Sequence, residues 1–128
     1  MERGVGREEA GTLPGFVSRK FRVAAEKGGR IMAILSVSYD LREHGRHDYQ
    51  HLEEAIKLFP SWCHALQSSW FIVTDVGPKK VYEYLKRYLG RTDSVLVVPV
   101  VMSAYWGQGL RQDVLDWLAA AYKAQQAA

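Results

Sequence analysis

Apolar and polar positions after residue 31 form a series of short periodic segments that predict alternating strands and helices. The apolar, β-rich run from Met32 to Tyr39 does not alternate strictly, which predicts a strand covered on one face and central in its sheet. Residues 62–66 and 69–74 are rich in aromatic and β-branched types and predict two strands with a bend at Gln67–Ser68. We expect a last strand over 93–102.

That last predicted strand contains Pro99. Proline cannot donate to a strand ladder, so the pairing is interrupted there or the strand lies at a sheet edge.

Three further segments have the 3–4-residue spacing of amphipathic helices. In the first, Tyr49 to Phe59, we expect Asp48 to cap the start and Pro60 to stop the helix. The second opens at Gly77–Pro78, with proline at the first helical position and Gly90 as the residue after its end. The third covers 110–124.

The predicted order is strand, helix, strand, strand, helix, strand and an added helix. This is the β-α-β-β-α-β order of an α+β, ferredoxin-like domain with a C-terminal helix. Two helices then cover one face of a four-stranded antiparallel sheet. We expect a second copy of the chain to cover the other face, which predicts a homodimer.

The first 31 residues lack a sustained period and are rich in glycine and charge, so we expect a disordered or loosely docked extension before a single domain over 32–128. A second hypothesis is that native translation starts at Met32 and that residues 1–31 are not part of the native protein. Residues 26–29 (Glu-Lys-Gly-Gly) require purine-rich codons that resemble a bacterial ribosome-binding site placed before a start at Met32.

Composition narrows the class of protein. A length of 128 residues suits one domain, and the single cysteine excludes an internal disulfide. No apolar run reaches the roughly 18–20 residues that span a bilayer, and residues 1–31 lack the apolar core of about 7–15 residues that a secretion signal has. We therefore expect a cytoplasmic protein without a membrane partner.

The basic charge lies outside the predicted domain. Residues 1–31 carry seven Lys or Arg and four Asp or Glu, which accounts for the whole net charge of +3. Residues 32–128 carry ten of each sign. Net charge is therefore no argument that the folded part binds a polyanion.

The strongest candidate for chemistry is Asp40, a carboxylate at the end of the first predicted strand. It is either a metal ligand or a turn residue bonded to its own loop. In the following loop, His44 and His47 can act as general acid or base. Together with His51 they can also form a zinc site, although no cysteine joins them.

Two arginines of the same loop, Arg42 and Arg46, can hold phosphate or remain solvated charges. Further along the chain, Gln67, Ser68 and Ser69 either line a nucleic-acid-binding cleft at the dimer interface or shape the bend between strands.

The other residues considered for chemistry are expected to have structural roles. Cys63 and His64 are neighbours in a strand, so they point to opposite faces and cannot form a nucleophile pair, and His64 is expected to be a hydrogen-bonded sheet histidine. Trp70 and Phe71 are expected in the core or an interface. The third strand lacks the aromatic signature of an RNA-recognition motif, which argues against that module.

Several segments in this order resemble a known family. Residues 32–41, 66–71 and 93–98 resemble the first, third and last core strands of the small CRISPR-associated adaptation nuclease, the second protein of that series. The SinR-like relatives of that nuclease are more similar. They share the Tyr-Asp-Leu strand ending, the segment at 62–64, the Ser-Ser-Trp strand and the Ala-x-Trp-x-Gly segment at 104–107, so the resemblance covers about residues 32–118.

The resemblance implies a ferredoxin-like homodimer in which two copies of Asp40 hold Mg²⁺, with Mn²⁺ as a substitute, for hydrolysis of RNA or DNA phosphodiesters. Some members of the family are non-catalytic DNA-binding scaffolds, and virulence-associated protein D, a toxin ribonuclease, is related by fold. The alternative is thus a non-catalytic dimer serving as a scaffold, regulator or toxin–antitoxin-type binding protein. The neutral domain and the longer loop after Asp40 depart from the nucleases.

Overall fold

The computed structural model describes residues 32–42 and 46–127, with the backbone alone for 46–49 and 127. The predicted extension at 1–31, including its two interpretations, lies outside the described residues. In the described ranges no helix is both long and apolar enough to cross a membrane.

Four antiparallel strands form one sheet in the order β2-β3-β1-β4. The strands are β1 (Ala33–Asp40), β2 (Ser61–Leu66), β3 (Ser69–Thr74) and β4 (Ser94–Val100). The central position predicted for the first strand is confirmed, as is the turn at Gln67–Ser68. Pro99 lies in β4, which is an edge strand, so the missing N–H donor is tolerated.

The described residues also form three α-helices, α3 (Arg46–Ile56), α4 (Pro78–Leu85) and α5 (Gln112–Ala127), with a 3₁₀ turn η1 (Lys86–Tyr88) after α4. Pro78 lies in the first turn of α4, as predicted. Asp48 was wrongly expected to cap α3, because the helix begins two residues earlier and Asp48 lies inside its first turn.

Gly90 was also wrongly expected as the residue directly after the second helix, because α4 ends at Leu85. The chain leaves α4 through η1, and Gly90 does not have a positive φ. Its backbone N–H instead donates to the Asp93 carboxylate at 2.8 Å.

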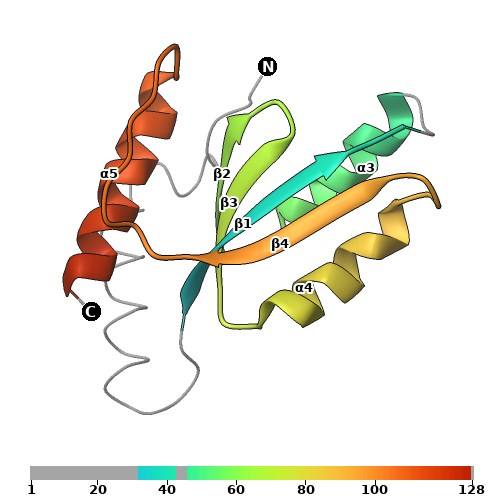
Figure 1. Ribbon diagram of the computed structural model, residues 1–128, viewed down its shortest axis with the longest axis horizontal. Coiled ribbons are helices and arrows are strands. Elements are labelled where there is room, and N and C mark those ends of the chain that lie inside the picture. Colours follow the sequence, from blue (N-terminus) through green and yellow to red (C-terminus); the bar gives the residue numbers. More distant parts are fainter. Residues whose placement is uncertain (1–31, 43–45, 128) are drawn as a thin grey trace.

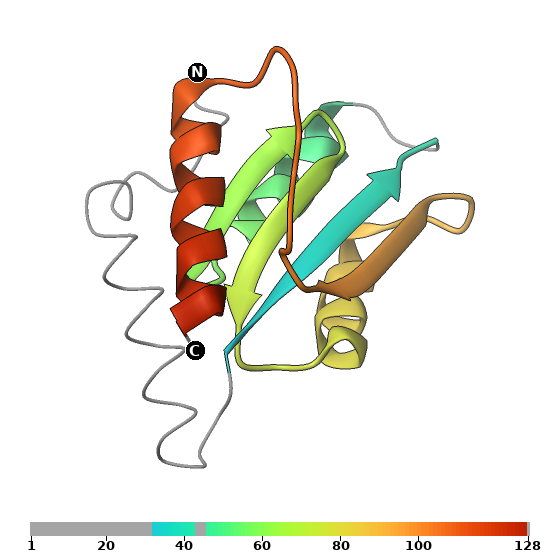
Figure 2. The ribbon, with the colours of Figure 1, turned by 60° about the vertical axis from the view of Figure 1, so that its left-hand side comes forward.

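The helices lie on both faces of the sheet (Figure 1). α3 and α4 cover one face, where Trp62, Trp70 and Ile72 belong to one buried cluster. α5 lies on the opposite face, over β2 and β3, and buries Trp117 against Cys63 and Val73 in a second cluster (Figure 2). The predicted α+β class and the C-terminal helix are thereby confirmed.

The second face was expected to be covered by a second copy of the chain, and this is wrong for its β2–β3 half. The tryptophans of the sheet point toward α3 and α4, and α5 covers the β2–β3 half. Alanines 120, 121 and 124 let α5 approach closely, and the Trp117 indole donates to the Ser61 hydroxyl at 3.0 Å.

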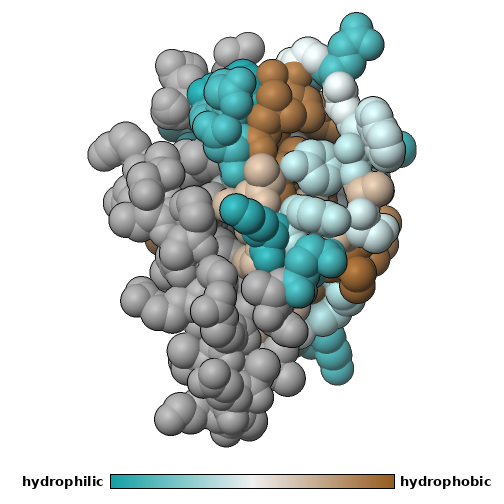
Figure 3. Space-filling model, turned by 90° about the vertical axis from the view of Figure 1, so that its left-hand side faces the viewer, coloured by the Kyte–Doolittle hydropathy of each residue, from teal (hydrophilic) through white to brown (hydrophobic). Residues whose placement is uncertain are grey.

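The outer side of α5 is a mixed surface. Its exposed residues include Gln112, Asp116 and Lys123 as well as Leu115. Figure 3 views the molecule from the α5 side, and the part not drawn in grey shows hydrophilic groups beside apolar ones. Exposed residues of the sheet lie elsewhere, at Asp40 in β1 and at Ser94, Leu96 and Val98 in β4.

Candidate functional site on the open sheet face

Asp40 is the last residue of β1 and is exposed, opposite Ser94 in the β1–β4 ladder. Ile34 packs beneath α5, and side chains alternate along a strand with period two. Ser36, Ser38 and Asp40 therefore share the α5 face, but they lie beyond the part of the sheet that α5 covers.

The uncovered area around Asp40, named here the open face, combines small hydroxyl residues with exposed apolar ones. Leu96 and Val98 are 64% and 39% exposed. The open face consists of Ser36, Ser38, Asp40, Ser69, Ser94, Leu96 and Val98.

One row of the ladder crosses all four strands at this end of the sheet. It runs from Leu96 through Ser38 and Ser69 to Leu66, which is 60% exposed. The Ser38 and Ser69 hydroxyl oxygens are 3.4 Å apart. Backbone pairing thus fixes the positions of two hydroxyls beside Asp40.

The β2–β3 turn lies next to the end of β1, because the Tyr39 N–H donates to the Ser68 carbonyl oxygen at 3.1 Å. Of the residues predicted for nucleic-acid binding, the structure brings Ser68 and Ser69 beside the Asp40 strand end. Gln67 is exposed in the same turn. Their part in binding stays a prediction.

Asp93 orders the chain immediately after Asp40, a role that the sequence analysis missed. One carboxylate oxygen accepts from the Arg42 N–H at 2.6 Å and the other from the Gly90 N–H at 2.8 Å. The only sequence signal is an acidic residue just before an apolar strand. The Arg42 side chain remains exposed, as phosphate binding requires.

The loop histidines are not placed. His44 lies outside the described residues, and Arg46 and His47 are described only as backbone at the start of α3. Within residues 32–42 and 46–127, no three His, Cys, Asp or Glu side chains gather as a metal site. The zinc hypothesis includes His44, so it stays a prediction, and Asp40 is the carboxylate that the open face offers.

His64 is a buried structural histidine, as predicted. Its ring stacks on Trp70 with centroids 3.8 Å apart, and its Nε2 lies 3.1 Å from the Gln67 carbonyl oxygen. The Trp70 indole in turn donates to the Tyr39 hydroxyl at 2.9 Å, so Trp70 is a core residue. These contacts connect the β2–β3 turn to the end of β1.

Cys63 lies on the opposite face of β2 from His64, which confirms that the two cannot act as a nucleophile pair. Burial, with a smaller contribution from the Asp113 charge, raises the pKa of the thiol from 9.0 to about 12. The thiol thus stays protonated throughout the neutral range.

We expect Cys63 to resist alkylation by iodoacetamide at pH 8.5 in the native protein and to react at the rate of a free thiol in urea. Because the folded pKa is raised, the thiol stabilises the fold below about pH 9, and this contribution is lost as the pH rises toward 12. Equal labelling rates in the native and urea-unfolded states would contradict the buried position. Mass spectrometry of the labelled peptide gives both rates.

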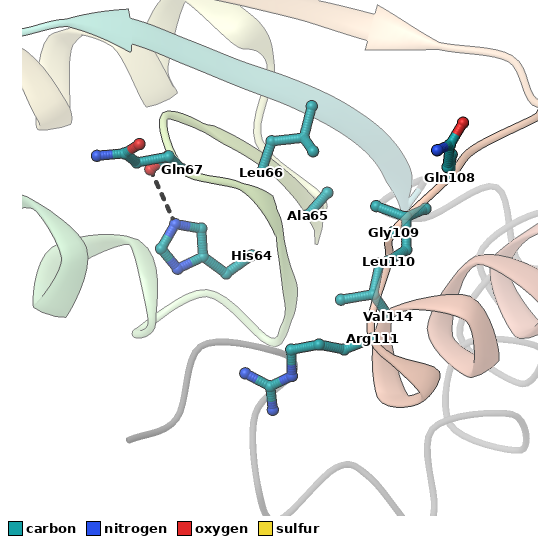
Figure 4. A pocket seen from close by; sticks show the side chains of 9 residues that line it. All are labelled: His64, Ala65, Leu66, Gln67, Gln108, Gly109, Leu110, Arg111 and Val114. Carbon is teal, nitrogen blue, oxygen red and sulfur yellow. Dashed lines mark hydrogen bonds between the residues drawn. The ribbon is translucent and has the colours of Figure 1, made fainter.

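A pocket of about 290 Å³ lies between the β2–β3 turn and the segment that leads into α5 (Figure 4). Arg111 lies at its edge, and its guanidinium donates to the Asp113 carboxylate at 2.9 Å. The sequence analysis did not predict this pocket, because its walls come from segments about 40 residues apart. The lining residues are His64, Ala65, Leu66, Gln67, Gln108, Gly109, Leu110, Arg111 and Val114.

Comparisons with models of known protein families, with curated proteins and with solved structures give no match. The similarity to the SinR-like relatives therefore stays a prediction.

Proposed function

We propose that the chain forms a cytoplasmic, ferredoxin-like homodimer that hydrolyses RNA or DNA phosphodiesters with Mg²⁺ held by Asp40 from both copies. The observation that carries the proposal is the exposed Asp40 carboxylate at the end of β1, beside an open face with hydroxyl and apolar residues. The antiparallel order β2-β3-β1-β4, with α3 and α4 on one face, supports the ferredoxin-like assignment.

Among the described residues, one open face supplies one carboxylate, so a second copy would complete the metal site. Asp93 is the neighbouring acid in this part of the chain, and its two oxygens already accept backbone N–H groups. Mg²⁺ is commonly bound through one or two carboxylates, with water and phosphate oxygens filling the remaining positions. Two Asp40 side chains near a two-fold axis fit this requirement.

The open face suits self-association. Leu96 and Val98 are exposed on it, and exposed apolar patches mark interaction sites. Ser36 and Ser38 are short, so they allow a second sheet to approach closely. A two-fold axis through this area uses the same patch twice and brings both Asp40 residues to the same groove.

The chain's own groups have distinct parts in the proposed reaction. Asp40 would hold the metal, which when bound activates a water molecule and offsets the phosphate charge. The exposed Arg42 guanidinium can donate to a phosphate oxygen, and the Ser38 and Ser69 hydroxyls can position the strand. His44 and His47 remain the proposed acid and base.

The direct test is an assay of the full chain with end-labelled single- and double-stranded RNA and DNA. Parallel reactions contain Mg²⁺, Mn²⁺ or EDTA. We expect cleavage of at least one substrate with Mg²⁺ or Mn²⁺ and none with EDTA. Cleavage that persists in EDTA would reject the metal mechanism.

The dimer is tested by placing a charge on the open face. We expect Leu96→Lys to convert the dimer to a monomer in sedimentation velocity, because a buried, unpaired ammonium is strongly unfavourable at an interface. The matched control is Val101→Lys, since Val101 is 86% exposed just beyond the other end of β4. A wild-type chain that sediments as a monomer, or a dimer unaffected by Leu96→Lys, would contradict this interface.

A non-catalytic dimer that binds nucleic acid or a protein is the second candidate. It is favoured by the single carboxylate that the described residues place on the open face. It is also favoured by the ten positive and ten negative side chains of residues 32–128, which give the domain no excess positive charge. Binding of labelled nucleic acid without cleavage under any metal condition would support it.

A further inference from the structure

We propose that the pocket between the β2–β3 turn and the start of α5 binds one unpaired nucleobase of the strand whose phosphate lies at Asp40. This inference rests on the proposed function and deepens it, because it makes single-stranded nucleic acid the substrate.

The chemistry of the lining fits a neutral, planar heterocycle. Ala65, Leu66, Leu110 and Val114 provide apolar walls. Single-stranded bases are commonly held by contacts to their faces and by hydrogen bonds to their polar edges. The volume of about 290 Å³ is at the lower limit of ligand pockets, which suits one ring system rather than a larger molecule.

The polar rim offers both donors and acceptors. The Gln67 and Gln108 side chains are exposed at the pocket, and an amide presents an N–H donor beside a carbonyl acceptor, which is the pattern that base edges require. Arg111 adds guanidinium donors (Figure 4). The Asp113 carboxylate, 2.9 Å from this guanidinium, offsets its charge, so the rim favours a base over a phosphate.

The position of the pocket links it to Asp40. Leu66 lines the pocket and is paired with Ser69, which is paired with Ser38, so the ladder leads directly from the pocket to the open face. Both sites lie on the α5 side of the sheet and at the same strand ends. Two strand spacings separate β2 from β1, about 10 Å, so one strand of nucleic acid can reach both.

The pocket is preformed. The contact between the His64 ring and the Gln67 carbonyl oxygen fixes the turn on one side. On the other side, Gly109 has a φ of 75°, a conformation that favours glycine and shapes the segment before α5. A preformed site binds without the cost of ordering its walls.

Nucleoside titration of ¹⁵N-labelled full-length protein, followed by NMR, tests the pocket without any cleavage. We expect the Gln67 and Gln108 side-chain amide signals to shift with at least one of adenosine, guanosine, cytidine and uridine. Gln108→Ala should weaken binding of single-stranded RNA or DNA by about 5–10-fold through the lost hydrogen bonds. Gln112→Ala is the matched control, because Gln112 is exposed on α5 outside the pocket, and it should leave affinity unchanged.

The outcomes separate the two proposals. Cleavage that depends on Asp40, without pocket shifts for any nucleoside, would overturn the pocket and leave the proposed function. Pocket shifts without cleavage would support base binding and reject the nuclease. An equal effect of Gln108→Ala and Gln112→Ala on affinity would also count against the pocket.

Discussion

Trp70→Ala is expected to lower the free energy of unfolding by about 3–5 kcal/mol, the range for removing a large buried aromatic side chain. Trp70 is completely buried, and its ring stacks on His64. Its indole N–H donates to the Tyr39 hydroxyl, which would be left without this donor in the core. Such a loss is a large fraction of the stability of an ordinary domain.

The control variant is Trp106→Ala, which removes the same side chain at a position that is 91% exposed. The difference between the two variants measures the effect of burial. We expect Trp106→Ala to change the free energy of unfolding by no more than about 0.5 kcal/mol. Urea denaturation followed by far-UV circular dichroism measures both variants. Similar midpoints for the two variants would contradict the position of Trp70 in the core.

Asp40→Ala is expected to reduce metal-dependent cleavage by at least about 100-fold. Removing a group that only hydrogen-bonds to a metal ligand can already reduce activity by up to about 100-fold, and Asp40 would be a ligand itself. The change should leave the fold intact, since Asp40 is exposed at a strand end. Initial rates with Mg²⁺ on the preferred substrate provide the measurement.

The control for this substitution is Asp116→Asn, which removes an exposed carboxylate on α5 that interacts with Gln112. Its rate should equal that of the wild type, as should its thermal midpoint. If Asp40→Ala retains the wild-type rate, Asp40 has no part in the chemistry.

Local signals in the sequence predicted much of the fold. The turn at Gln67–Ser68 follows from polar residues between two apolar runs, and the start of α4 follows from Pro78 in the first turn. Pro99, which lacks a donor, predicted either interrupted pairing or an edge strand, and β4 lies at the edge. In each case the deciding physical property belongs to one or two neighbouring residues.

Features that depend on distant contacts were missed. Periodicity predicted α5 but did not reveal that Trp117 packs against Cys63. We therefore expected a second copy of the chain, rather than α5, to cover the β2–β3 half of the second sheet face. The hydrogen bond from the Arg42 N–H to Asp93 joins residues 51 positions apart. No local sequence pattern predicts either contact.

The same limit applies to the candidate site. Asp40 is identifiable because a carboxylate at the end of an apolar strand is visible in sequence. The pocket beside Gln67 is not identifiable, because Gln108 and Arg111 reach it only once α5 docks on β2.

Calorimetric titration of the full chain with Mn²⁺ is the most direct measurement of the shared metal site. Two Asp40 carboxylates around one ion predict one bound Mn²⁺ per two chains, with no binding at that site in Asp40→Ala. One ion bound per chain by a monomer, or undiminished binding by Asp40→Ala, would contradict it.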